Sequence, residues 1–212
     1  MSVDFTVLDI TPEQYAASPI LLARLRIESP GPDPVHAMAL RAQVRIEPGR
    51  RSHTQEEGLA LSDLFGTRDR WGTTVHPFVW LHCATMVQGF TGTTEVDLPM
   101  PCTYDFDVTA SKYLNVLGEG TVPLIFLFSG TVFTRGLTGF GVEQIPWDRE
   151  CRFDLPVSTW RALVDEHFHG VGWVRVEHET LAALTAYKAG RGLMSHSAAL
   201  QELLDHSREV AS

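Results

Sequence analysis

VPLIFLFSGTVFT, at residues 122–134, is the longest apolar run of the sequence. It is too short to span a bilayer, which takes about 20 apolar residues. Its β-branched and aromatic side chains predict a strand that is buried on both faces, and Gly130 indicates a bulge or bend within it. We expect the rest of the chain to be arranged so that it covers this strand.

Two alternating segments lie closer to the N-terminus. Residues 21–28 and 38–47 place apolar side chains at every second position, with mostly charged side chains between them. This pattern is typical of half-buried strands. The intervening segment, 29–34, is a Pro/Gly turn, so the default prediction is an antiparallel hairpin. Residues 78–87 are apolar on both faces, which predicts a second central strand.

The other regular elements are shorter. Thr54 and Glu57 fit a capping box, which predicts a helix as far as about residue 65. After Pro156 the apolar period changes from two to about 3.6, as in helices. Further strands are predicted at 4–10, 93–98, 103–108, 142–145 and 152–155, and helices at 158–168, 179–189 and 195–208.

The fold class follows from this order. We expect a mainly β (α+β) protein, an antiparallel β-sandwich of about seven or more strands with a short helical C-terminal appendage. The predicted domains are the sandwich at 1–155 and the appendage at 156–212, packed on it.

Composition restricts the partners. The formal net charge is −9 and no Lys/Arg run exceeds two residues, which argues against nucleic acid and against insertion into, or binding to, an anionic membrane. Residues 1–20 lack a secretory signal pattern, and the three cysteines form no CxxC. We therefore expect a cytoplasmic protein with reduced thiols.

A few residues have the chemistry of metal ligands. His82 and Cys83 are adjacent in a predicted strand, so they point to opposite faces and do not readily share one ion. Cys102 is more simply read as a small core residue. His167 and His169 lie at a predicted helix end, where they complement the helix dipole. A metal site built from these five residues remains an alternative interpretation.

No catalytic signature is present. The sequence has no GxSxG and no phosphate-binding loop, so we expect no catalytic residue and no cofactor. Most large aromatic residues belong in the core. Those in or near predicted turns, Trp71, Phe90 and Phe140, are the candidates for an exposed partner-binding patch.

Several long phrases carry a resemblance across nearly the whole chain: DFTVLDITPEQYAASP, ALRAQVRIEPGRR, FTGTTEVDLPMPCTYDFDV, LFSGTVFTRG and PWDRE…LPVSTWRALVDEHF. Together they resemble an uncharacterised actinobacterial family known as a domain of unknown function. Its members are often encoded near high-affinity nickel–iron hydrogenases. The resemblance implies an accessory role with a protein partner, such as a hydrogenase subunit or maturation factor.

The sequence therefore leaves three functional interpretations. The first is a non-enzymatic accessory or adaptor protein in nickel–iron hydrogenase assembly or function. The second is a metal-handling protein or metalloenzyme that uses the histidine and cysteine ligands. The third is a structural component of a larger homo-oligomeric assembly.

Overall fold

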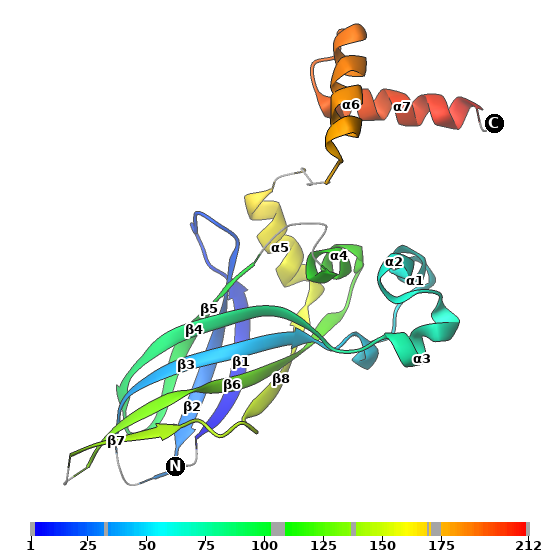
Figure 1. The fold of residues 1–212 in the computed structure, drawn as a ribbon. Helices are drawn as coiled ribbons and strands as arrows, with labels where there is room; N and C mark the ends of the chain where they lie inside the picture. Colours follow the sequence, from blue (N-terminus) through cyan, green and yellow to red (C-terminus); the bar gives the residue numbers. More distant parts are fainter. Residues whose placement is uncertain are drawn as a thin grey trace. The chain divides into compact units, whose positions relative to one another are not determined.

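The computed structural model describes residues 3–31, 34–102, 109–136, 139–168, 170 and 175–210 (Figure 1). The chain forms two compact units, Met1–Trp173 and Val174–Ser212. The first unit holds all eight strands of the described chain, and the second holds a pair of helices. No helix in the described part of the chain is long and apolar enough to cross a bilayer.

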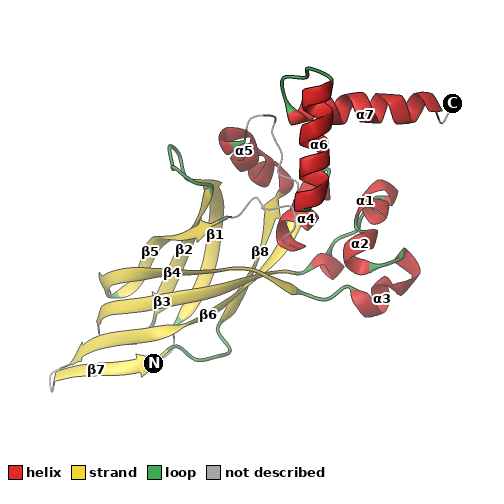
Figure 2. Cartoon of the chain, turned by 45° about the horizontal axis from the view of Figure 1, so that its top comes forward, coloured by secondary structure: helices red, strands yellow, loops and turns green. Residues whose placement is uncertain are grey.

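The strands form two antiparallel sheets, which confirms the mainly β class (Figure 2). Sheet A has the order β1-β2-β5, and sheet B has the order β4-β3-β6-β7 with β8 paired to β6. The bounds are β1 Asp4–Pro12, β2 Ile20–Ser29, β3 Val35–Ile46, β4 Phe78–Phe90, β5 Gly92–Pro101, β6 Thr121–Gly136, β7 Gly139–Gln144 and β8 Glu150–Pro156.

The apolar run at 122–134 is a central strand of sheet B, as predicted. Its predicted burial on both faces holds for residues 122–126, whereas Ser129 is exposed. Residues 78–87, the other predicted central strand, belong to β4 at the edge of the sheet. The apolar run lies within β6, which pairs with β3 along one side and with β8 and then β7 along the other. Phe126 and Phe128 are buried, and the ring of Phe128 stacks on Phe5 of sheet A with centroids 4.3 Å apart. The core therefore lies between the two sheets.

Gly130 allows β6 to lie close to its neighbour. Its φ is +142°, and a Cβ atom there would lie 2.0 Å from the carbonyl oxygen of Ala39 on β3. No L side chain fits at that distance, so this position requires glycine.

The predicted hairpin between the two alternating segments is wrong. Both segments are strands with the predicted inward faces, but β2 pairs with β1 and β5, whereas β3 pairs with β4 and β6. Alternation specifies which side chains are buried and does not specify the neighbouring strand. The segment after β2 carries the chain from one sheet to the other.

Short helices connect and flank the strands. The predicted capping box is confirmed, since the Thr54 hydroxyl accepts from the Glu57 amide and the Glu57 carboxylate accepts from the Thr54 amide. The predicted strand at 103–108 lies outside the described residues. The helices are η1 Pro48–Arg50, α1 Gln55–Ala60, α2 Ser62–Phe65, η2 Arg68–Arg70, α3 Trp71–Thr74, α4 Thr109–Val116, α5 Val157–His167, α6 His178–Gly190 and α7 His196–Val210.

The C-terminal helices were all predicted, and α5 belongs to the first unit. It contacts β1 and β8 and buries Val157, Trp160 and Leu163. The division into domains at 1–155 and 156–212 stays a prediction. Contacts within the chain place Met1–Trp173 in one compact unit.

Candidate interaction surfaces

The candidate thiol ligands lie inside the sandwich. The Cys83 Sγ donates to the Ala42 carbonyl at 3.7 Å, and the Cys102 Sγ donates to the Met100 carbonyl at 3.3 Å. Burial raises the pKa of each thiol to about 12, so both are protonated at neutral pH. His82 is exposed on the opposite face of β4 from Cys83, as the strand alternation requires.

Of the two histidine candidates at the end of α5, His167 is described and has polar partners of its own. His167 Nδ1 lies 3.1 Å from the Leu163 carbonyl, and its Nε2 lies 3.2 Å from the Ala16 carbonyl. His169 lies outside the described residues. Across the described chain, no three His, Cys, Asp or Glu side chains gather where they could hold a metal ion. The metal-ligand interpretation stays a prediction.

The candidate partner-binding aromatics lie in different places. Trp71 is half-buried in α3, where its indole N–H donates to the Gly66 carbonyl at 3.0 Å and its ring meets His53 edge-on. Phe90 ends β4 and packs half-buried against the core. Phe140 is in β7, and its side chain lies outside the described residues. Their role in partner binding remains a prediction.

A buried ion pair fixes the helices between β3 and β4 to the sandwich. Arg51 Nη2 lies 3.1 Å from Glu57 Oε1, and both side chains are mostly buried. Glu57 also accepts from the amides of Thr54 and Gly118, each at 2.9 Å. Burial alone would raise the Glu57 pKa, but these hydrogen bonds and the Arg51 charge lower the pKa overall. This cluster therefore has a structural role, and we call Arg51, Glu57 and the amides of Thr54 and Gly118 the clasp.

A histidine–tyrosine pair lies beside the clasp. His53 Nε2 is 3.0 Å from the hydroxyl of Tyr113, which is fully buried. Burial lowers the His53 pKa, the charges of Arg51 and Arg68 lower it further, and Glu57 opposes them. Burial also raises the Tyr113 pKa. Both groups are uncharged at neutral pH, which suits a packed polar contact.

The second unit exposes its apolar side chains. Of the side chains described between residues 175 and 209, only Ala199 is buried. Three leucines lie at helical spacing along one face of α7, and their exposed fractions range from 42% to 54%: Leu200, Leu203 and Leu204. Such a face is typical of a protein–protein contact. We call these three residues the leucine stripe.

Polar contacts join α6 and α7. The Tyr187 hydroxyl donates to Glu202 at 3.2 Å, and Arg191 pairs with the same carboxylate at 2.9 Å. Thr185 Oγ1 lies 3.1 Å from His196 Nε2. Polar groups thus join the two helices, and within this unit α6 does not cover the leucine stripe.

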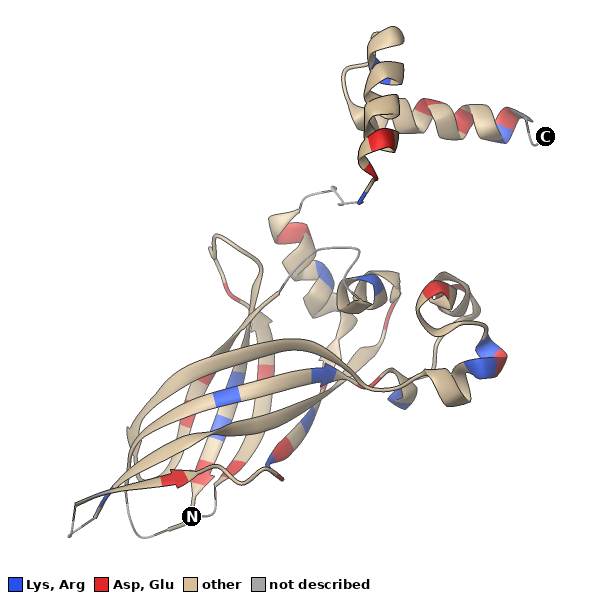
Figure 3. Ribbon diagram, viewed as in Figure 1, with Lys and Arg blue, Asp and Glu red and all other residues tan. Residues whose placement is uncertain are grey.

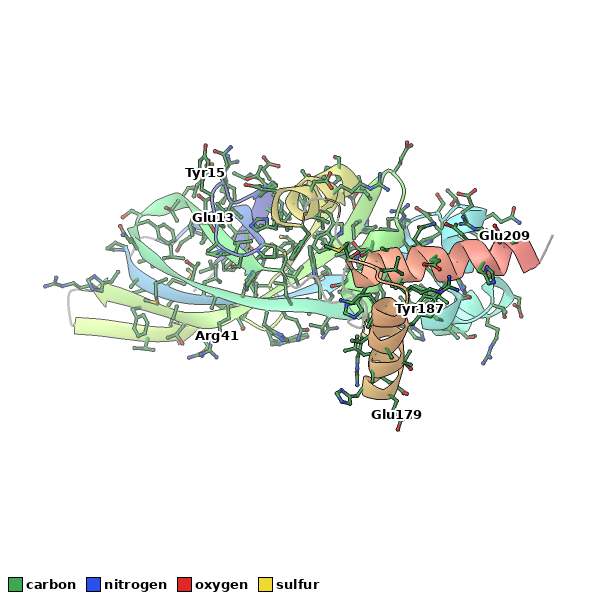
Figure 4. All side chains as sticks on the ribbon, turned by 90° about the horizontal axis from the view of Figure 1, so that it is seen from above. Glu13, Tyr15, Arg41, Glu179, Tyr187 and Glu209 are labelled. Carbon is green, nitrogen blue, oxygen red and sulfur yellow. The ribbon has the colours of Figure 1, made fainter. Side chains whose placement is uncertain are left out.

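Sheet B carries a shallow depression on its outer side. Its volume is about 530 Å³. Arg41 points from it away from the sheet (Figure 4). The lining comes from β3, β4 and β6: Arg41, Ala42, Gln43, His82, Cys83, Ala84 and Ser129.

The sequence reasoning missed two strongly exposed aromatic residues, Tyr15 and Trp147. Trp147 lies in the turn between β7 and β8 and has an exposed fraction of 93%. The Arg149 amide donates to the Pro146 carbonyl at 3.2 Å and closes this turn. Pro146 and Arg149 are thus the first and last residues of the turn, and Trp147 and Asp148 are its central residues.

A family model covers residues 1–212, and the chain therefore belongs to the family of unknown function DUF6084. No curated protein matches the sequence.

Proposed function

We propose that this family member is a non-enzymatic accessory or adaptor protein that works by binding a protein partner. The observation that supports the proposal is the uncovered leucine stripe on α7. Among the described side chains of this helix pair only Ala199 is buried, so the three leucines leave apolar surface in water, and a partner that covers them removes that cost. The aromatic at Trp147 offers a further exposed contact.

The proposed partner is a subunit or maturation factor of a nickel–iron hydrogenase. The support is the resemblance of the chain to a family whose genes often accompany such hydrogenases. The proposed location is the cytoplasm, where hydrogenase maturation factors are available. Nucleic acid is not a proposed partner, because an acidic chain with a net charge of −9 repels phosphate.

The test is affinity purification of the tagged full-length protein from hydrogen-oxidising cells that produce it naturally. Leu204→Glu places a charge in the stripe. The matched control, Ala198→Glu, places the same charge on an exposed α7 position outside the stripe. We expect a hydrogenase component with the wild-type protein and the control, and its loss with Leu204→Glu.

Two results would contradict the proposal in different ways. Equal retention by Leu204→Glu would reject the leucine stripe as the contact. An eluate without any hydrogenase component would reject the proposed partner.

A further inference from the structure

The part of the outer face of sheet B that surrounds Arg41 is formed by three neighbouring strands, β4, β3 and β6. Their register aligns the outward residues in rows, so that Arg41 of β3 lies between Ala84 of β4 and Ser129 of β6. The next row toward the N-terminus of β3 aligns Ala39 with Met86 and Thr131. The face consists of Ala37, Ala39, Arg41 and Gln43 on β3, His82, Ala84, Met86 and Gln88 on β4, and Leu127, Ser129, Thr131 and Phe133 on β6.

The part of this face around Arg41 has no acidic side chain; Glu150 of β8, on the same face beside Leu127, is paired with Arg152 at 3.1 Å. The chain contains 26 Asp and Glu residues, but β3, β4 and β6 contain none (Figure 3). Arg41 is exposed and has no ion-pair partner among the described residues. Sheet A differs, because Arg24 pairs there with Asp97 and Arg26 with Glu95, each at 3.0 Å. The Arg41 guanidinium is therefore available to a carboxylate of another molecule.

Most side chains beside Arg41 are small, and its polar neighbour Gln43 lies 2.9 Å from His82, measured between the two Nε2 atoms. Ala39 and Ala84 flank Arg41, and Met86 has an exposed fraction of 63%. Small side chains let a helix approach a sheet closely, and packing of a helix against a sheet face is a common layer arrangement. A strand could not add here, because β3 is already hydrogen-bonded to neighbours along both sides.

We propose that the outer face of sheet B binds an acidic amphipathic helix of a partner protein. Leucine-type side chains of that helix would pack on Ala39, Ala84 and Met86, while a carboxylate pairs with Arg41. The proposal goes beyond the proposed function because it names a second surface and the chemistry of what it binds. A nucleic acid does not suit this face, since Arg41 and Arg45 are the two outward arginines of β3, too few to follow a phosphate backbone.

The test uses the full-length protein and two synthetic peptides of about 18 residues, enough for about five helical turns. Both carry leucines at i, i+3, i+4 and i+7 spacing. One has glutamates at the other positions, and its twin has lysines. Binding is followed by fluorescence anisotropy at about 0.15 M salt, where distant charges are screened.

The comparison is stringent because the net charge of −9 favours the lysine twin everywhere except at a local cationic site. We expect the glutamate peptide to bind about tenfold tighter than its twin, and Arg41→Glu to remove that preference. Ala84→Glu, in the floor of the depression, should act in the same way. The matched control is Arg70→Glu on η2, another exposed arginine, and it should bind like wild type.

The proposal is overturned if the lysine twin binds as tightly as the glutamate peptide. It is also overturned if Arg41→Glu and Ala84→Glu bind like wild type while keeping the wild-type melting temperature, or if a single-stranded oligonucleotide binds more tightly than either peptide. None of these outcomes involves a hydrogenase component, so failure here and failure of the proposed function are distinguishable.

Discussion

The Glu57 carboxylate accepts a hydrogen bond of 2.9 Å from the backbone amide of Gly118, across a sequence separation of 61 residues. The same carboxylate caps α1 through the Thr54 amide and pairs with Arg51. Arg51 in turn donates to the carbonyls of Glu119 and Thr121. One buried acid thereby connects the helices after β3 with the start of β6.

Replacing this acid should be costly. In Glu57→Ala, the mostly buried Arg51 loses its counterion and the Thr54 and Gly118 amides lose their acceptor. We expect the free energy of unfolding to fall by about 3 kcal/mol or more, measured by urea denaturation. The control is Glu56→Ala at the neighbouring exposed position, which should change it by about 0.5 kcal/mol or less. Equal effects of the two substitutions would disprove the clasp.

Stability should fall when the pH drops below neutrality. The His53 pKa in the folded protein lies below its ordinary value of 6.5, so the unfolded chain binds the proton more readily. The unfolding free energy therefore decreases as the pH falls below 6.5. The lowered Glu57 pKa acts in a separate window, because its contribution persists above the ordinary value of 4.5 and is lost only in more acidic solution.

A urea series between about pH 7.5 and pH 5.5 isolates the histidine effect. His53→Gln keeps a polar group near Tyr113 but cannot titrate, so its stability should depend less on pH than that of the wild type. The control, His76→Gln at an exposed position, should keep the wild-type dependence. An unchanged slope in His53→Gln would show that another group causes the effect.

Gly130→Ala should prevent normal folding. The new Cβ would lie 2.0 Å from the Ala39 carbonyl oxygen, at a φ of +142°. We expect a loss of about 4 kcal/mol or more, measured by thermal unfolding or seen as insoluble expression. Gly139 is the matched control, because its φ is +129° but no other atom lies within 4 Å of its Cβ position. Gly139→Ala should lose only about 1–2 kcal/mol from backbone strain.

The three cysteines should be unreactive in the folded protein. Burial raises the pKa of Cys83 and Cys102 to about 12 and that of Cys151 to about 11. Since only the thiolate attacks, labelling by a thiol reagent at pH 8 should be about a hundredfold slower than in urea-unfolded protein. A thiol that labels as fast in the native as in the unfolded state would contradict this burial and renew the case for a ligand role.

Local sequence patterns predicted the elements well and their neighbours less well. The apolar run at 122–134 and the change of period after Pro156 both correspond to real elements, β6 and the C-terminal helices. The β2–β3 hairpin failed because strand pairing depends on contacts across the whole chain, whereas alternation depends only on the nearest side chains. The opposite orientation of His82 and Cys83 was predictable for the same local reason.

The candidate surfaces were harder to predict. The absence of Asp and Glu from β3, β4 and β6 is visible in the sequence, but the three segments become one face only when their pairing is known. Trp71 and Trp147 both lie near turns. Only the packing shows that Trp71 is half-buried beside His53 and that Trp147 is exposed.

Neither sheet comes from a continuous stretch of chain. Sheet A takes β5 from beyond β3 and β4, and sheet B takes those two strands from between β2 and β5. A single cleavage cannot release one sheet intact, and neither sheet can form a complete layer without the chain of the other. Residues of the first unit should therefore unfold in one cooperative transition, and fragments ending between the strands should behave as unfolded polypeptides.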